Sequence, residues 1–311
     1  MTINITMTYS IGGLIQATDY NSFLTGLNQI NTIWSTGTGD AGYGQTALTS
    51  LSIGATVASA TQWATLINTV NSIARHQTNN GTNLTSTTAG GTVTYLSGLS
   101  GNISTYYTNR GTFATQGSTV TGTNLVSYAN AAAAAAYNNT VFTRTITFSS
   151  GDAARYFFNA GGQLNLVLST TIKTASARST ATSTLIGTNI GGFSAFRRAS
   201  GGGRTGTGGT VTTNSTVIGY RQLTTVLQTL VLINNATAPY TTDVANLRVK
   251  SNGVQGANGD LGSIITFTLG LSAPAHSTFN GALGVGVNHR IDVVPPETTN
   301  ISNSWGTITV A

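Results

Sequence analysis

Thr140 divides the chain into two parts that differ in the spacing of their apolar residues. Before it, apolar residues recur at intervals of three and four, as on one face of a helix, and after it they alternate with polar residues, as in half-buried strands. Helices and strands in separate runs are typical of a mixed fold with segregated parts. We therefore predict an α+β multidomain protein, in which a small helical N-terminal domain precedes a C-terminal antiparallel β-sandwich of jelly-roll-like type.

Short segments rich in Thr, Val and Ile, separated by Gly, Asn and Pro, predict about eight strands in residues 141–311. In the first of them, Phe142, Ile146 and Phe148 fall on one face. Two packed sheets would bury one such face of each strand, which is why we predict a sandwich. The predicted strands are 141–149, 163–169, 215–219, 226–234, 246–250, 263–271, 283–294 and 304–310.

An internal repeat lies in the N-terminal part, where ATDYNSFLTGLNQI at residues 17–30 aligns with ATQWATLINTVNSI at residues 60–73. Each copy predicts one amphipathic helix, with Thr18 and Thr61 as the N-terminal caps. We predict that residues 1–80 form a helical docking domain. For Tyr20 and Trp63, plain core packing is favoured over any ligand role. The residues expected to hold the docking and oligomer interface are Tyr20, Phe23, Leu27, Trp63, Leu66 and Val70.

Residues 81–140 form a Thr- and Gly-rich segment followed by an Ala-rich one. Short helices are expected around Tyr95–Leu99 and Ile103–Tyr107. Residues 125–139, LVSYANAAAAAAYNN, predict a connector helix, because Ala has the highest helix propensity. This helix would pack against its copies in an oligomer or serve as a solvated spacer.

Three adjacent aromatic residues occur in AARYFFNAGGQL, at residues 153–164. We predict a short helical turn, Ala153 to Asn159, capped by Asp152, whose aromatic residues close the end of the sandwich. Gly161 and Gly162 would give the backbone freedom to enter the next strand. The alternative is a carbohydrate-binding platform. The three aromatic residues are Tyr156, Phe157 and Phe158.

Charge is scarce in this chain: only 6% of its residues are charged, against about 25% in typical soluble domains. Neutral surfaces tend to associate, so we expect a homo-oligomer, a trimer or higher, rather than a monomer. The net charge of +6 is too thinly spread for the basic stripes that bind nucleic acid. Because no run approaches 18 apolar residues, we also expect no membrane insertion.

The sequence offers little for catalysis or metal binding. Because the chain contains no cysteine, it can form neither disulfides nor thiolate metal sites, and it has no cysteine nucleophile. Of the 7 carboxylates, two are interpreted as helix caps, and Asp40 and Asp260 as turn formers in Gly-rich loops. The histidines, His76, His276 and His289, lack the spacing of metal sites. We predict no catalytic, cofactor-binding or metal-binding residue, no cofactor and no enzyme.

Residues 197–209, RRASGGGRTGTGG, combine Arg197, Arg198 and Arg204 with six glycines. The segment does not match the P-loop pattern, because Arg204 stands where that pattern requires Lys. We predict an inter-strand loop whose guanidinium groups contact a partner's carboxylates or phosphates. The alternative is a solvated loop tip without a specific role.

Taken together, the helix repeat, TGTGDAGYGQ at residues 36–45 and ARYFFNAGGQL at residues 154–164 resemble virion structural proteins of tailed bacteriophages. The resemblance covers the first 80 residues and about 140–170. It implies a non-enzymatic subunit of the neck or of a tail-associated fibre or appendage, made in the host cytoplasm and assembled into the virion. Its partners would be copies of itself and other virion proteins. The alternatives are an adhesin for host cell-surface polysaccharide and a capsid decoration protein.

Overall fold

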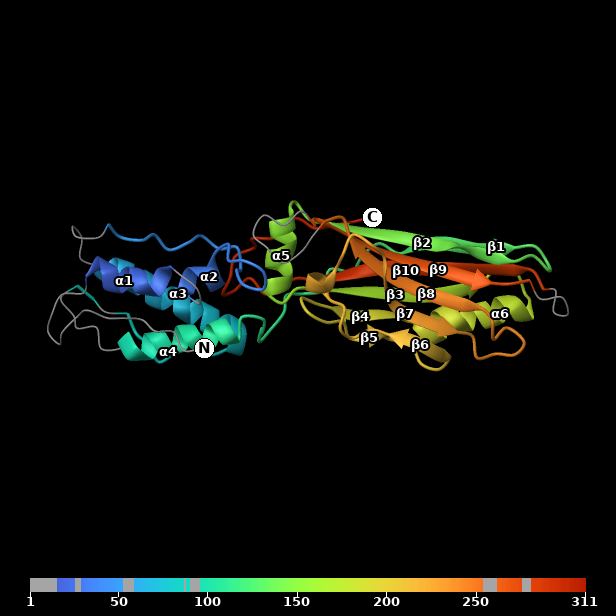
Figure 1. The fold of residues 1–311 in the computed structure, drawn as a ribbon, viewed down its shortest axis with the longest axis horizontal. Coiled ribbons are helices and arrows are strands. Elements are labelled where there is room, and N and C mark those ends of the chain that lie inside the picture. The colour runs from blue at the N-terminus through green and yellow to red at the C-terminus, as the bar shows by residue number, and fades with distance from the viewer. Residues whose placement is uncertain are drawn as a thin grey trace.

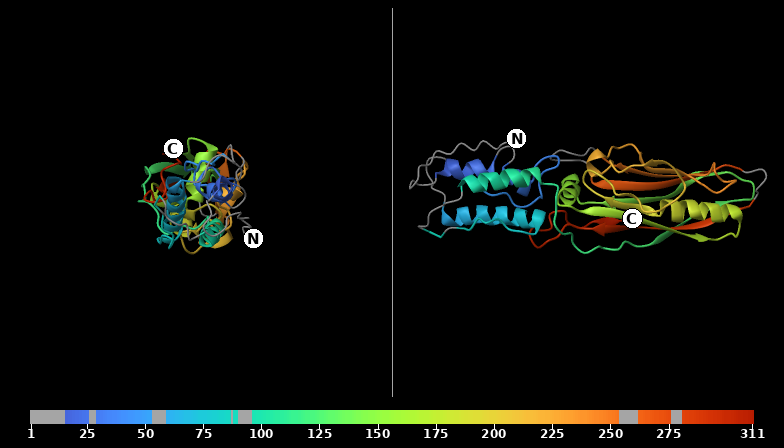
Figure 2. Two further views of the ribbon diagram at one scale, coloured as in Figure 1. Left: turned by 90° about the vertical axis from the view of Figure 1, so that its left-hand side faces the viewer. Right: turned by 90° about the horizontal axis from the view of Figure 1, so that it is seen from below.

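The computed structural model describes residues 16–25, 29–52, 59–86, 88–89, 96–253, 262–275 and 281–311. In it the protein is elongated, with the helices of residues 17–108 at one end and two β-sheets at the other (Figure 1). The views in Figure 2 show the same division, and the end-on view shows a narrow cross-section. The fold is a mixed α+β fold with two antiparallel sheets in a sandwich-like arrangement, which confirms the predicted class at this level.

The helices follow the predicted periodicity in the N-terminal part but differ at their ends. The first copy of the repeat forms a short helix and begins a second one, and Leu27 lies outside the described residues. Thr18 and Thr61 are not the caps: Ser59 caps the long helix, and its Oγ accepts a hydrogen bond from the Gln62 amide at 3.2 Å. The helices are α1 (Ala17–Leu24), α2 (Ile30–Trp34), α3 (Ala60–Thr78), α4 (Leu96–Thr108), α5 (Gly151–Asn159) and α6 (Ala177–Ser183), with a π-helical stretch η1 (Thr184–Ile190) and a 3-10 turn η2 (Tyr220–Gln222).

The two copies of the repeat pack against each other around one tryptophan. The ring of Trp63 in α3 lies 6.1 Å from that of Tyr20 and 5.8 Å from that of Phe23, both in α1. All three side chains are at most 3% exposed. Edge-to-face contacts of this kind stabilise a core beyond the area that they bury.

Two antiparallel sheets form the other end of the molecule. One has the order β1-β10-β3-β4-β5 and the other β11-β2-β9-β8-β7-β6. The strands are β1 (Leu125–Ala131), β2 (Tyr137–Thr147), β3 (Gln163–Ile172), β4 (Gly192–Phe196), β5 (Gly203–Arg204), β6 (Thr210–Asn214), β7 (Gln228–Asn234), β8 (Val244–Ser251), β9 (Ile264–Ala273), β10 (Leu283–Val294) and β11 (Thr309–Val310).

Side chains from the two sheets meet in the core between them. Phe196 of β4 contacts Phe267 of β9 edge to face, with their ring centroids 5.5 Å apart. Near the β1 and β2 edges, Phe142 stacks on His289 of β10 at 4.2 Å. The alternating burial along β8, where Ala245, Leu247 and Val249 are buried, is what the sequence pattern predicted.

The predicted Ala-rich connector helix is wrong. Its residues form strand β1, a turn, and the start of β2. β1 pairs along its whole length with β10, from Leu125 opposite His289 to Ala131 opposite Leu283. The run of Ala is too short to form a helix by itself, and pairing with a sheet outweighs a propensity of less than about 1 kcal/mol per residue. Ala134 in the turn has a positive φ of 61°.

Other predicted elements differ at particular points. Residues 215–219 are not a strand, and the neighbouring β6 ends at Asn214. In 304–310 only Thr309–Val310 pairs, with β2. The two short helices expected around residues 95–107 are one helix, α4, within the described part of that segment.

The helix predicted before Gly161 is confirmed as α5, and it stands where the helices meet the sheets (Figure 1). Its cap is Ser150 rather than Asp152, because the Ser150 Oγ accepts a hydrogen bond from the Ala153 amide at 3.0 Å. Phe157 and Phe158 are buried at the end of the sandwich, as predicted, whereas Tyr156 is half-buried and its ring lies against Gly44. Gly161 has a φ of +96° and leaves no room for a Cβ, which would lie 2.3 Å from the Phe113 ring.

Candidate functional site at the junction of helices and sheets

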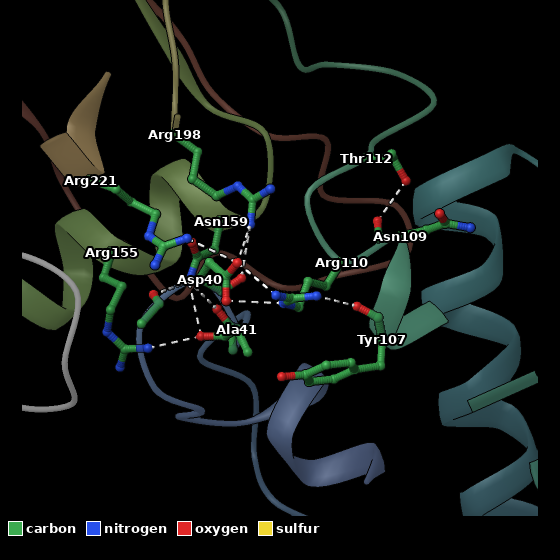
Figure 3. Close-up of polar contacts among 12 residues, drawn as sticks. Asp40, Ala41, Tyr107, Asn109, Arg110, Thr112, Arg155, Asn159, Arg198 and Arg221 are labelled. Carbon is green, nitrogen blue, oxygen red and sulfur yellow. Dashed lines mark hydrogen bonds and ion pairs between the residues drawn. The ribbon is translucent and has the colours of Figure 1, made fainter. Parts of the chain in front are cut away.

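Asp40 lies at the junction and pairs with three arginines from distant parts of the chain (Figure 3). Arg110, just after α4, donates from Nη2 to Oδ2 at 2.7 Å and from Nε to Oδ1 at 3.1 Å. Arg221 of η2 lies 2.9 Å from Oδ2, and Arg198, just after β4, lies 3.5 Å from it. We call these four residues the Asp40 cluster.

The charge on Asp40 is stabilised by its partners. Burial by itself would raise the pKa of this carboxyl, but the Arg110 hydrogen bonds and the charges of Arg221 and Arg198 together lower the pKa below its ordinary value. Asp40 is therefore ionised at neutral pH. One carboxylate joins the helical end, through Arg110, to the sandwich, through Arg198 and Arg221.

Glycines shape the loop that carries Asp40. Gly42 has a φ of +92°, and a Cβ there would lie 2.2 Å from the Thr36 carbonyl oxygen. Only glycine fits here, because a side chain would disfavour this positive φ and its Cβ would clash with the backbone of Thr36. The GTGDAGYG sequence at residues 37–44 therefore specifies a tight loop that presents the Asp40 carboxylate to the arginines.

Helix α5 holds the same loop through its backbone. Arg155 is completely buried, and its Nη1 donates to the carbonyl oxygens of Thr36 at 2.7 Å and Ala41 at 2.9 Å. Asn159, one turn later in α5, donates from Nδ2 to the Ala41 oxygen at 2.9 Å. Hydrogen bonds from a charged guanidinium to buried carbonyls are stronger than neutral ones. The loop is thereby fixed to the end of the sandwich (Figure 3).

A second set of polar contacts extends from Tyr43 into the helices. The Tyr43 hydroxyl donates to the Arg110 carbonyl at 3.1 Å and accepts from Gln77 Nε2 at 2.9 Å. Burial raises the pKa of Tyr43 to about 12, so the phenol stays neutral. Its ring lies 5.0 Å from that of His76 in α3.

The segment after β10 also contacts the helices. His76 Nδ1 lies 2.9 Å from Glu297 Oε1. Glu297 Oε2 accepts from the Thr299 amide at 2.6 Å and from the Asn300 amide at 3.0 Å. Burial opposes ionisation of Glu297, but the His76 hydrogen bond and these amides lower its pKa to about 2.

Chemically, this arrangement positions parts of the chain relative to one another. Most polar groups of the Asp40 cluster are directed at each other and at backbone carbonyls, and the exception is the covered Nε of Arg221. Among the described residues, no three His, Cys, Asp or Glu side chains lie close enough to hold a metal ion. No helix in the described ranges is both long and apolar enough to span a bilayer.

The predicted interface residues lie inside the helical end. The side chains of Trp63, Leu66 and Val70 are at most 3% exposed, as are those of Tyr20 and Phe23. They pack on one another within a single chain. A second subunit bound to the helical end would therefore meet other side chains, and these five would support that surface from within.

The three arginines of the predicted partner loop all contact their own chain. Arg198 belongs to the Asp40 cluster. Arg197 donates from Nε to Gln163 Oε1 at 2.9 Å. Arg204 donates to the carbonyl oxygens of Asn189 and Gly208. Of the three, only Arg198 pairs with Asp40.

Sequence reasoning missed most of the Asp40 cluster. It explained Asp40 as a turn former and did not consider Arg110, Arg155 or Arg221. The available signal was the scarcity of charge. A chain with 7 acidic and 13 basic residues can form few ion pairs, so each carboxylate is a candidate partner for an arginine. Which arginines meet Asp40 depends on the fold alone.

No protein-family model matches the chain, and no curated protein or solved structure is detectably similar to it.

Proposed function

We propose that this protein is a non-enzymatic structural subunit of a tailed-bacteriophage virion, forming a neck or a tail-associated fibre or appendage by oligomerisation. The observation that carries the proposal is the junction: the Asp40 cluster, with Arg155 and Glu297, fixes the helical end to the sandwich in one elongated body. Such a body holds its two ends at a set separation, as a part of a larger assembly must. A chain in which only 6% of the residues are charged has a largely neutral surface, and this supports burial against neighbouring subunits.

In this proposal the helical end is a separate docking domain, and the sandwich projects from the particle. We assign the sandwich to the jelly-roll-like type. The pairing of β1 with β10 and of β2 with β9 supports this assignment, because the first strands of the sandwich then lie beside its last long ones in both sheets.

The test has two parts, mass and location. The purified chain should form a trimer or a higher oligomer in light scattering, and antibodies raised against it should label the neck or tail of intact particles in electron micrographs. A chain that stays monomeric and is absent from particles would contradict the proposal. Trp63→Asp would not test the interface, because Trp63 lies in the core and a charge buried there is expected to destabilise the helical end itself.

A capsid decoration protein would differ in its position and copy number, both of which the same micrographs and quantitative mass spectrometry of particles report. Adhesion to host polysaccharide is the second candidate. The groove described next favours it, because that groove is suited to a sugar ligand.

A further inference from the structure

A groove of about 370 Å³ lies on the outer face of the sheet that contains β2, β9, β8 and β7. Register places most of its residues on one side: Thr140 and Asn246 are both opposite Gly270, and Val244 is opposite Ser272. Asn139 and Leu271, which pair with each other, alternate to the other side of the sheet. The volume is at the lower end of the range of small-molecule sites, about 300–1,000 Å³. The lining residues are Asn138, Asn139, Thr140, Leu232, Val244, Asn246, Arg248, Gly270, Leu271 and Ser272.

Gly270 and two bulges open the groove. Gly270 has no side chain to fill it, although a Cβ there would fit, at 3.5 Å from Arg248 Nη2 and 3.8 Å from the Asn246 carbonyl oxygen. β-bulges interrupt β2 between Thr140 and Phe142 and β7 between Thr229 and Val231. Bulges bend and twist a strand, and these two flank the groove on either side.

Arg248 is the charged residue of the groove and lacks a counterion there. Among the described residues no carboxylate pairs with it, and its Nε is covered without a hydrogen-bond partner. Asn246 Oδ1, beside it on the same face, is likewise covered and unpartnered. Covered polar groups in proteins normally have partners, so these two atoms on one groove floor are available to hydrogen-bond a ligand.

The lining chemistry indicates the class of this ligand. Side-chain amides of Asn138 and Asn246 and hydroxyls of Thr140 and Ser272 both donate and accept hydrogen bonds, as sugar hydroxyls do. A single guanidinium fits one carboxylate as a bidentate fork, whereas a phosphate site would be expected to gather more positive charge.

We propose that this groove binds a uronic-acid unit of an acidic polysaccharide, with Arg248 holding the carboxylate and the surrounding amides and hydroxyls holding the ring hydroxyls. This site is distinct from the Asp40 cluster, and it does not depend on the virion role proposed above. Loss of sugar binding would leave oligomerisation and particle labelling unchanged, so the two proposals fail in different measurements.

The experiment is titration calorimetry of the full-length chain with short oligomers of galacturonate, glucuronate and mannuronate. Neutral oligosaccharides of equal length and inorganic phosphate are the comparison ligands. Arg248→Gln should weaken binding by about tenfold or more, because it removes the charged fork. Gly270→Leu should abolish binding by filling the groove while leaving the charge in place.

Lys250→Gln is the matched control. Lys250 lies two residues from Arg248 on the same face of β8 but outside the groove, and its loss changes the net charge equally. It should alter the affinity by less than about twofold, as expected for a solvent-screened charge. Unchanged melting temperatures would show that each variant is folded.

The proposal is supported if at least one uronate oligomer binds the wild type. Arg248→Gln and Gly270→Leu must then lose this binding, and Lys250→Gln must keep it. It is overturned if no uronate oligomer binds at millimolar concentration, or if Arg248→Gln binds as tightly as the wild type. Equal affinity for neutral oligosaccharides, or full displacement by phosphate, would also overturn it, because neither fits a carboxylate-bearing sugar.

Discussion

His76 in α3 lies 2.9 Å from Glu297, which follows the last long strand of the sandwich, although the two residues are 221 positions apart in the chain. The contact joins the helical end to the C-terminal segment, and it is completely buried on the His76 side. Because the pKa of Glu297 is lowered to about 2 by this contact and by two backbone amides, its ionisation is coupled to folding.

We predict that Glu297→Gln makes the free energy of unfolding depend less on pH below about pH 4.5. A carboxyl whose pKa falls from 4.5 to about 2 on folding stabilises the protein above pH 4.5, and that stability is lost as the pH falls toward 2. The loss should be about 2–3 kcal/mol for the wild type and much smaller for Glu297→Gln. Urea denaturation at a series of pH values measures it. Equal slopes for both proteins would contradict the coupling.

His289 should produce a second pH effect at higher pH. Burial, together with the nearby charge of Arg144, lowers its pKa from 6.5 to about 4. Between pH 6.5 and 4, His289 is then protonated in the unfolded chain but neutral in the folded chain. The free energy of unfolding therefore falls by about 2–3 kcal/mol as the pH drops from 6.5 to 4. His289→Gln keeps a partner for Ser127 and removes the titration. Its profile should be flatter in this window, and a profile parallel to the wild type would refute the assignment.

Asp40→Asn should loosen the junction. The variant leaves three arginines facing one another without their carboxylate, at a cost of about 1–3 kcal/mol for this partly buried cluster. Small-angle scattering should show a less extended average shape, because the helical end would swing relative to the sandwich. The comparison variant is Arg290→Gln, which breaks a single ion pair, leaves Asp292 with the Gly122 amide as a partner, and should cost less than about 1 kcal/mol. Equal costs would contradict a special role for Asp40.

The turn that connects β1 to β2, which lie in different sheets, gives a test for which a helix and a turn between strands predict opposite results. Ala134 has a φ of 61°, which costs about 1–2 kcal/mol for a residue with a Cβ. Ala134→Gly should therefore raise stability by about 0.5–1 kcal/mol, whereas Ala133→Gly in the same turn should lower it slightly. Thermal unfolding distinguishes the two. If both variants are destabilised, the segment has the helical conformation that its composition predicted.

Local patterns predicted much of the fold because they reflect interactions between near neighbours. The alternation in residues 163–169, 246–250 and 283–294 places strands where β3, β8 and β10 occur. The spacing of Phe23, Trp63, Leu66 and Val70 identifies the side chains that fill the helical core. The pair Phe157 and Phe158 was rightly expected at the end of the sandwich, because adjacent buried aromatics need a large apolar space.

The Ala-rich segment and the candidate site show where this reasoning stops. Propensity favoured a helix at residues 125–139, but strand pairing with β10, more than 150 residues later in the chain, decided the outcome. Asp40 was read as a turn residue, and nothing in its neighbourhood indicated Arg110, Arg198 or Arg221. The arginines of residues 197–204 were expected to face a partner, yet each contacts its own chain.

The sequence by itself determined most of the helical and extended segments, residues 125–139 being the clear exception, and also which faces are apolar and how few charges the protein has. Those properties depend on residues close together in the chain. Only the tertiary structure decided which charges pair, that the C-terminal segment returns to α3 through Glu297 and His76, and that Arg248 lies in a groove over Gly270. Electrostatic and hydrogen-bonded contacts act over a few ångströms in space, and distance along the chain does not reveal which residues come that close.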